Sequence, residues 1–448
     1  MHSEKSSLLC KLTSSIIIRC RSILLIFFNI FLGLFVRQLT HVYRLMKYFG
    51  RHFQQLIGIL TGNHYSLVNV SDDDFSIGII ADRLLKEKNV FINENPSMYD
   101  IFHIYLSKIL YELPDTIMNQ CQDWGFSRDS VNILTYSQNK DFKKYPYETQ
   151  AAVLRHETSK TLIIAFRGTE PMDLLQWLTD ASTNFIDMKN IPKYINNETN
   201  PVNVHAGFYY ALGLEKFNPS ESIDFSQITS ETPMFIQLIH SIEQFRRIHG
   251  QCNITIIGHS LGGGLASLLT FVLLSYGYES SITGVFTYGQ PLVGNKSYAS
   301  ILNEKLGNRF HRWVNHCDIV TRIPVIELPS LAWYYARTPY CDALEAATNN
   351  NSTPSNPFHH RYYHSGLRFK IDTQGHLIKQ HTKDQGQTLA CEDHLDLFHG
   401  WYSIRKACSS LLHVTPVRAL LWLIAPAEIN DHFPGDYARN IKKIVKQQ

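Results

Sequence analysis

The feature that most constrains this fold is a glycine-flanked serine between a strand pattern and a helix pattern. Residues 254–257 are β-branched, the motif G-H-S-L-G occupies 258–262, and an apolar helix-forming segment fills 265–274. Small residues must flank a serine where a strand turns sharply into a helix, because the two backbones approach closely there. The pattern therefore predicts a nucleophile elbow with Ser260 at its tip. The alternative is an ordinary glycine-rich turn.

Strand and helix patterns alternate on both sides of this motif. Residues 69–112 have acidic caps and amphipathic stretches, which predict a helical lead-in. The predicted strands cover 130–137, 150–156, 161–167, 254–257, 283–288 and 310–315, and a predicted amphipathic helix covers 233–249. The alternation is typical of an α/β fold with a mostly parallel central sheet flanked by helices.

The N-terminal segment differs from the rest of the chain in charge and hydropathy. Residues 1–62 carry eight lysines and arginines against one glutamate, although the whole chain has a formal net charge of only +3. The remainder is therefore net acidic. Basic character confined to an apolar segment favours anionic lipid headgroups as a partner and disfavours nucleic acid.

An uncharged apolar run at 22–36 lies inside this segment. Its 15 residues would span roughly 22 Å as a helix, which is short of a ~30 Å hydrocarbon core. Extending the run to 16–36 adds two arginines, which could reach the headgroups from near one end. We therefore expect residues 1–62 to form a membrane anchor or interfacial helices, and 63–448 to form the α/β domain. A packed helix and a cleaved signal peptide are the alternatives.

Several short motifs beyond the elbow stand in a characteristic order. They are A-F-R-G-T at 165–169, W-L-T-D at 177–180, V-H-A-G-F at 204–208, T-Y-G-Q-P-L-V-G at 287–294, V-N-H-C-D-I-V at 314–320 and Y-Y-H-S-G at 362–366. Together they resemble the class 3 (fungal-type) triacylglycerol lipases of the α/β-hydrolase superfamily, particularly their bacterial branch. The resemblance implies an α/β-hydrolase fold, a late strand at 362–366, and the hydrolysis of lipid esters.

Such hydrolysis needs two partners for Ser260. A serine hydroxyl is a weak nucleophile until a histidine removes its proton, and a carboxylate must hold that histidine in the correct tautomer. In α/β-hydrolases the chain order is Ser, then Asp or Glu, then His. Asp318 follows the predicted strand 310–315, so we expect it at the carboxyl edge of the sheet. We predict that Asp318 is the triad carboxylate. A turn or capping aspartate is the alternative.

Two histidines compete for the role of base. His394 lies in E-D-H-L-D-L-F, which resembles the fungal enzymes, and His432 lies in N-D-H-F-P-G-D-Y, which resembles the bacterial branch. In that branch a tyrosine follows the histidine by five residues, as Tyr437 does here. Phe433 and Pro434 depart from the small residues expected at their positions. We favour His432 as the catalytic base and keep His394 as the alternative. The other histidines, including His259, His311 and His364, are expected to be structural.

Two backbone N–H groups should stabilise the oxyanion that forms during acyl transfer. One belongs to Leu261, directly after the nucleophile, and the resemblance assigns the other to Thr169. Residues 170–181 place an apolar cluster immediately after that position. We expect this segment to be a lid that covers the site in water and that turns its apolar side chains toward lipid at an interface. The alternative is an ordinary core-facing helix.

These features predict a serine-dependent lipid ester hydrolase of the triacylglycerol lipase type, which works through an acyl-enzyme and is membrane-associated. Its partners are a lipid ester and a membrane or lipid interface. The mechanism needs no cofactor, and because the eight cysteines form no C-x-x-C pair, no metal site is expected. The alternatives are a phospholipase A1-like enzyme, a lipase-like membrane protein that no longer catalyses, and a membrane-remodelling N-terminal helix with an esterase attached.

Overall fold

The computed structural model describes the following parts of the chain. They are residues 79–81, 95–137, 148–168, 185–188, 201–216, 228–316, 318, 320–322, 362–372, 374–380 and 431–447. All of them belong to one of the chain's two compact units, which comprises Gln54–Pro324, Asn356–Leu389 and Leu395–Gln448. The predictions made for residues 1–62, Thr169, 170–181 and His394 lie outside the described residues.

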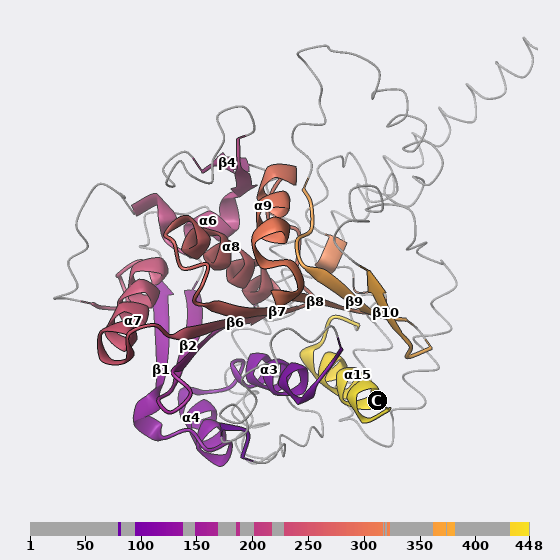
Figure 1. The fold of residues 1–448 in the computed structure, drawn as a ribbon, viewed down its shortest axis with the longest axis horizontal. Coiled ribbons are helices and arrows are strands. Elements are labelled where there is room, and N and C mark those ends of the chain that lie inside the picture. The colour runs from indigo at the N-terminus through magenta and orange to yellow at the C-terminus, as the bar shows by residue number, and fades with distance from the viewer. Residues whose placement is uncertain are drawn as a thin grey trace, which may run out of the picture. The chain divides into compact units, whose positions relative to one another are not determined.

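A central sheet organises the described residues (Figure 1). Its strands, in spatial order, are β1 (Val131–Ser137), β2 (Glu148–His156), β3 (Thr161–Phe166), β6 (Asn253–His259), β7 (Ile282–Tyr288), β8 (Phe310–Asn315), β9 (Leu367–Ile371) and β10 (Leu377–Gln380). The strands from β3 to β9 run parallel to their neighbours, whereas β1, β2 and β10 pair antiparallel at the two edges. A separate antiparallel pair joins β4 (Phe185–Asp187) to β5 (Asn203–His205).

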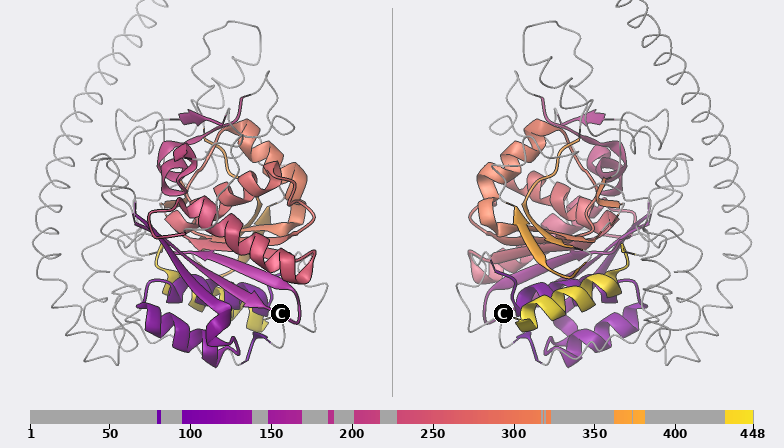
Figure 2. Two further views of the ribbon diagram at one scale, coloured as in Figure 1. Left: turned by 90° about the vertical axis from the view of Figure 1, so that its left-hand side faces the viewer. Right: turned by 90° about the vertical axis from the view of Figure 1, so that its right-hand side faces the viewer.

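Helices cover both faces of this sheet (Figures 1 and 2). One face carries α6 (Ala206–Ala211), α7 (Met234–His249), α8 (Leu261–Ser275) and α9 (Lys296–Leu306). The other face carries α3 (Met98–Ile109), α4 (Pro114–Asp123) and α15 (Pro434–Gln447). The predicted α/β-hydrolase fold, with its mostly parallel sheet flanked by helices, is confirmed.

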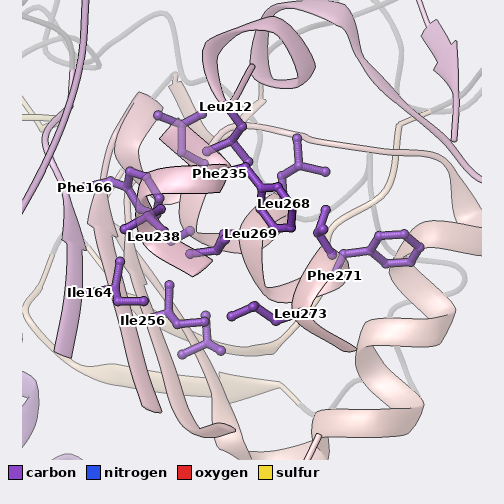
Figure 3. Close-up of a cluster of buried hydrophobic side chains, with 14 of the residues drawn as sticks. Ile164, Phe166, Leu212, Phe235, Leu238, Ile256, Leu268, Leu269, Phe271 and Leu273 are labelled. Atoms are coloured by element: carbon purple, nitrogen blue, oxygen red, sulfur yellow. The ribbon is translucent and has the colours of Figure 1, made fainter. Parts of the chain in front are cut away.

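Two buried clusters fill the space between the sheet and its helices. Successive side chains of a strand point to opposite faces, and β3 shows this directly. Its residues Leu162, Ile164 and Phe166 lie in the cluster that includes α7 and α8, which Figure 3 draws. Its residues Ile163 and Ala165 lie in the cluster that includes α3 and α15. Because both faces are covered, β3 is apolar from Leu162 to Phe166, as the strands of parallel sheets are.

The late strand is displaced from its predicted position. The motif at 362–366 was expected to form a strand, but β9 begins at Leu367, and Tyr363 makes only an isolated bridge to Gly294. The reason lies at Gly366, whose φ of +89° is a left-handed conformation that interrupts an extended strand. The backbone of 362–366 therefore leads into the sheet without belonging to it.

Candidate active site

The elements that carry the predicted site residues end at one edge of the sheet. Ser260 directly follows β6, Asp318 follows β8, Gly289 follows β7 and Gly168 follows β3. These four strands are parallel to one another, so their carboxyl ends meet. In α/β folds this edge is where ligand and catalytic sites are built.

The strand–turn–helix at 253–275 has the geometry of a nucleophile elbow. Ser260 has φ of +59° and ψ of −131°, a strained conformation for a residue with a side chain. Its N–H donates to the carbonyl of Tyr288, 2.9 Å away, which fixes the turn against β7. A Cβ on Gly262 would lie 2.5 Å from the carbonyl oxygen of Phe166, and one on Gly258 would collide with the backbone of Gly262. Only glycine therefore allows α8 to approach β3 and β6 this closely.

The structure brings Ser260, His432 and Asp318 together. Ser260 Oγ and His432 Nε2 are 2.7 Å apart, and His432 Nδ1 and Asp318 Oδ2 are 2.8 Å apart. All three side chains are buried. Because an ionised carboxylate can only accept, Nδ1 of His432 carries the proton and Nε2 is free to accept from the serine hydroxyl. This arrangement can pass a proton from Ser260 to an imidazole whose charge Asp318 then balances.

Asp318 is held by further donors. Tyr437 donates its hydroxyl to Oδ2 over 2.6 Å, and the N–H of Val320 donates to Oδ1 over 2.9 Å. The bond from Val320 is a local turn contact of the kind considered as the alternative role of Asp318. Asp318 therefore makes this turn contact and also contacts His432. Burial, together with the neighbouring carboxylate of Asp318, raises the pKa of Tyr437 well above its ordinary value. Tyr437 therefore stays a phenol and remains a donor.

Hydrogen bonds from Asn315 hold the C-terminal segment at this edge of the sheet. Asn315 Nδ2 donates to the carbonyl of Asp431 over 2.8 Å, and the N–H of Asn315 donates to the Tyr437 hydroxyl over 3.0 Å. Tyr437 lies in the first turns of α15, whose buried side chains pack beside α3. Asn315 and Tyr437 already lay in two separate sequence motifs, at 314–320 and 430–437, but nothing in the linear pattern indicated that they contact each other.

Gly289 is a site residue that sequence reasoning missed. Its φ is +60°, and an added Cβ would lie 2.8 Å from both Asp318 Oδ2 and His432 Nδ1. The position therefore needs glycine for its backbone conformation and for the space beside the histidine–aspartate hydrogen bond. The glycine in the motif T-Y-G-Q-P was the available signal.

Of the two predicted oxyanion donors, Leu261 lies within the described residues and Thr169 lies outside them. Leu261 is the first residue of α8, where unpaired N–H groups favour negative charge. Thr169 lies outside the description, but its neighbour Gly168 is buried against the elbow. A Cβ on Gly168 would lie 3.0 Å from the Cβ of Ser260. The described segment that ends at Gly168 therefore lies directly beside the nucleophile.

The histidines expected to be structural lie outside the triad, where His311 is buried and His364 is half-buried. His311 Nδ1 contacts Asp100 Oδ1 at 3.4 Å, and His364 Nε2 donates to the carbonyl of Thr321 over 2.7 Å. His259 is also buried, and burial followed by its neighbour His432 places its pKa well below the ordinary value. Among the described residues, no cluster of histidine, cysteine and carboxylate side chains could hold a metal ion.

Comparison with known proteins gives matches over part of the chain. Residues 163–328 match the family model described as Lipase (class 3). The chain is 27% identical over 364 residues to the triacylglycerol lipase OBL1 of Arabidopsis thaliana, covering 76% of this chain and 63% of that protein. It is 26% identical over 173 residues to the phospholipase A(1) DAD1 of Arabidopsis thaliana, covering 38% of this chain and 35% of that protein.

These relatives are longer than the matched region. The chain spans less than two thirds of the length of either of them. Among solved structures, the Rhizomucor miehei triacylglyceride lipase is similar, with a TM-score of 0.41 and 17% sequence identity, covering 74% of this chain and 96% of that chain.

Proposed function

We propose that this chain, which belongs to the class 3 lipase family, hydrolyses the carboxylic esters of lipids through a covalent acyl-enzyme. The observation that carries the proposal is the continuous hydrogen-bonded series from Ser260 through His432 to Asp318. A serine at a strained elbow, a neutral imidazole and a buried carboxylate are the three parts that serine hydrolysis requires. The names of the relatives agree with a lipid ester as the substrate.

In the first step Ser260 Oγ attacks the ester carbonyl while its proton moves to His432 Nε2. The carboxylate of Asp318 balances the imidazolium that results, because it accepts from Nδ1 over 2.8 Å. The developing oxyanion is stabilised by the N–H of Leu261, and we propose the N–H of Thr169 as the second donor. The alcohol leaves with the proton from His432, and the acyl group stays on Ser260.

The second step reverses these roles with water in place of the alcohol. His432 Nε2 takes a proton from the water molecule as it attacks the acyl-enzyme, and the proton then returns to Ser260 Oγ as the fatty acid leaves. Every proton transfer uses Nε2 of His432, while Nδ1 stays hydrogen-bonded to Asp318. The pathway needs no cofactor.

The direct test compares the full chain with its Ser260→Ala variant, both solubilised in detergent, on p-nitrophenyl butyrate and p-nitrophenyl palmitate. We expect turnover by the native chain and a loss of three or more orders of magnitude (about 10³-fold or greater) in the variant. The ratio of the two rates separates a long-chain lipase from a short-chain esterase. Activity that persists in Ser260→Ala, or a folded native chain without turnover, overturns the proposal.

A phospholipase A1-like activity is the second candidate. It is supported by the similarity to the phospholipase named above and by the basic, apolar segment at 1–62. Both activities would use the same triad, so only the substrate separates them. Product analysis on phosphatidylcholine vesicles and on triacylglycerol emulsions decides: release of a 2-acyl lysophospholipid supports the phospholipase, and diacylglycerol alone supports the lipase.

Membrane association belongs to the same proposal. Residues 1–62 combine an uncharged apolar run with eight basic side chains, which suits an anchor or interfacial helices on anionic lipid. The described residues contain no helix that is long and apolar enough to cross a membrane, so this assignment rests on the sequence of 1–62. Deleting 1–62 should abolish recovery in the membrane fraction and leave hydrolysis of the soluble butyrate ester intact. Membrane recovery of the truncated chain contradicts it.

A further inference from the structure

The ring of His259 joins the segment after α3 to the backbone of the base. His259 Nε2 and the carbonyl oxygen of His432 are 2.8 Å apart, and the hydroxyl of Tyr111 lies 2.8 Å from His259 Nδ1. Both residues are buried. The mechanism described above uses neither of them. The contacts nevertheless connect positions 111, 259 and 432, which are far apart in the sequence.

The direction of each hydrogen bond follows from the partners. A carbonyl oxygen can only accept, so Nε2 of His259 carries the proton and donates to His432. The neutral ring then has an unprotonated Nδ1, which accepts from the Tyr111 hydroxyl. Burial holds the pKa of His259 well below its ordinary value, so the ring stays neutral. A neutral ring suits this place, because a cation here would oppose the imidazolium that forms on His432.

Packing fixes the same three side chains. The rings of His259 and His432 have centroids 4.7 Å apart. Tyr111 packs against Phe433, the residue after the base. A Cβ on Gly168 would collide with the Tyr111 hydroxyl, so the end of β3 lies directly against that hydroxyl. Tyr111 thus contacts the nucleophile's strand, the base's segment and the chain that leads to position 169.

We propose that His259 and Tyr111 are positioning residues for the base His432. The inference rests on the proposed function and deepens it. During catalysis the bond between Ser260 and His432 is lost as soon as Ser260 is acylated, because the serine oxygen then carries the acyl group. From that point the base is held by Asp318 on Nδ1 and by the bond from His259 to its backbone carbonyl. Of the two steps, the second, in which Nε2 must accept a proton from water, therefore depends more strongly on His259 and Tyr111.

The test uses the full chain with single substitutions at the two positions. His259→Phe fills the volume but donates no hydrogen bond, whereas in His259→Gln the side-chain amide can still donate to the carbonyl of His432. Tyr111→Phe removes only the hydroxyl. The matched controls are His103→Phe and Tyr298→Phe. His103 is buried with neither ring nitrogen bonded to another described residue, and the side-chain hydroxyl of Tyr298 shares a hydrogen bond with Ser267.

Rates are measured per active site, titrated with a p-nitrophenyl phosphonate that labels Ser260. We expect His259→Phe to lower kcat by roughly five- to tenfold, with kcat/KM falling less, because slow deacylation lowers KM together with kcat. Tyr111→Phe should show the same pattern more weakly. His259→Gln should recover most of kcat, and both control variants should keep native rates per site.

A double substitution tests whether His259 acts through the base. In the His432→Ala background, His259→Phe should cost less than about twofold, because the group it positions is gone. A full additional loss there, or an equal fall of kcat and kcat/KM in the single variant, overturns the positioning role and leaves the proposed function standing. Absence of Ser260-dependent turnover in the native chain overturns both.

Discussion

The nucleophile elbow occupies one continuous stretch, residues 253–275, whereas the contacts around His432 come from separate parts of the chain. In the elbow, a strand, a tight turn and a helix follow one another directly. The surroundings of the base are assembled from the segment after α3, the ends of β6, β7 and β8, and the C-terminal helix. The difference teaches that a nucleophile can be specified locally while its base depends on the whole sheet. Substitutions in the second region should therefore reduce catalysis in proportion to how directly they touch His432.

The largest effect is expected from Asp318→Asn. An asparagine at this position can still accept from the N–H of Val320 through its amide oxygen, so the turn survives. It offers an uncharged partner to His432 Nδ1, which favours the wrong tautomer and leaves the imidazolium unbalanced. We expect a fall in kcat of up to about 10⁴-fold with little change in Tm. A loss below tenfold would mean that Asp318 serves only its local turn.

Gly289→Ala should come next. A Cβ at this position would lie 2.8 Å from Asp318 Oδ2 and from His432 Nδ1, and displacements on the scale of 1 Å in an active site cost on the order of 10²-fold in rate. Gly375→Ala is the matched control, since Gly375 also has positive φ but a Cβ added there would meet no heavy atom within 4 Å. Both variants carry backbone strain, so comparable Tm values with very different kcat values are expected. Equal activity in the two variants would remove Gly289 from the site.

Tyr437→Phe should have a smaller effect. It removes one donor from Asp318 Oδ2 and the acceptor of the N–H of Asn315, while Val320 and His432 still bind the carboxylate. A hydrogen bond to a charged group contributes about 1.5–3 kcal/mol, and the low end of this range corresponds to a fall in kcat of roughly tenfold. Steady-state kinetics beside Tyr298→Phe, which removes a buried hydroxyl elsewhere, isolates the effect. A native kcat in Tyr437→Phe contradicts it.

The smallest effect on activity is expected from His103, on the opposite side of the sheet from α8. Burial lowers the pKa of His103 to about 3, whereas the unfolded histidine titrates near its ordinary value of about 6.5. Between these values the unfolded chain binds the extra proton, so stability is full above pH 6.5 and is lost as the pH falls toward 3. His103→Phe should flatten this loss, as chemical denaturation between pH 4 and pH 7 can measure, and should leave kcat unchanged. The charges of Asp100 and His311 nearby also affect the pKa of His103. If the pH dependence of unfolding is the same in His103→Phe as in the native chain, this explanation is wrong.

Much of the fold could be predicted because its signals are local. The β-branched run before Ser260, the apolar run after it and the strand patterns from 130 to 315 each form the expected element, with ends shifted by a few residues. The exception is 362–366, where the left-handed backbone of Gly366 delays the strand to Leu367. The strand at 362–366 was implied by the resemblance alone, and a motif match does not specify the backbone conformation at one glycine.

The site could be predicted less completely. Ser260, Asp318 and His432 were identified because each lies in a recognisable motif, and the structure places them in contact. Tyr111 lay in the predicted helical lead-in 69–112 without a motif of its own, and His259 was expected only to be structural. Their roles arise from contacts between residues separated by 148 and 173 positions. Such pairings depend on how α3 and α15 pack on the sheet, which no local pattern specifies.

The central claim is that His432 is the base for Ser260, and the comparison of His432→Ala with His394→Ala tests it most directly. Both variants are assayed on p-nitrophenyl butyrate, with the folded fraction checked by near-UV circular dichroism. The hydrogen bonds that His432 accepts from Ser260 and donates to Asp318 predict a fall in kcat of about 10³-fold or more for His432→Ala and a near-native kcat for His394→Ala. The reverse pattern would contradict the assignment of the base and, with it, the arrangement described around Asp318.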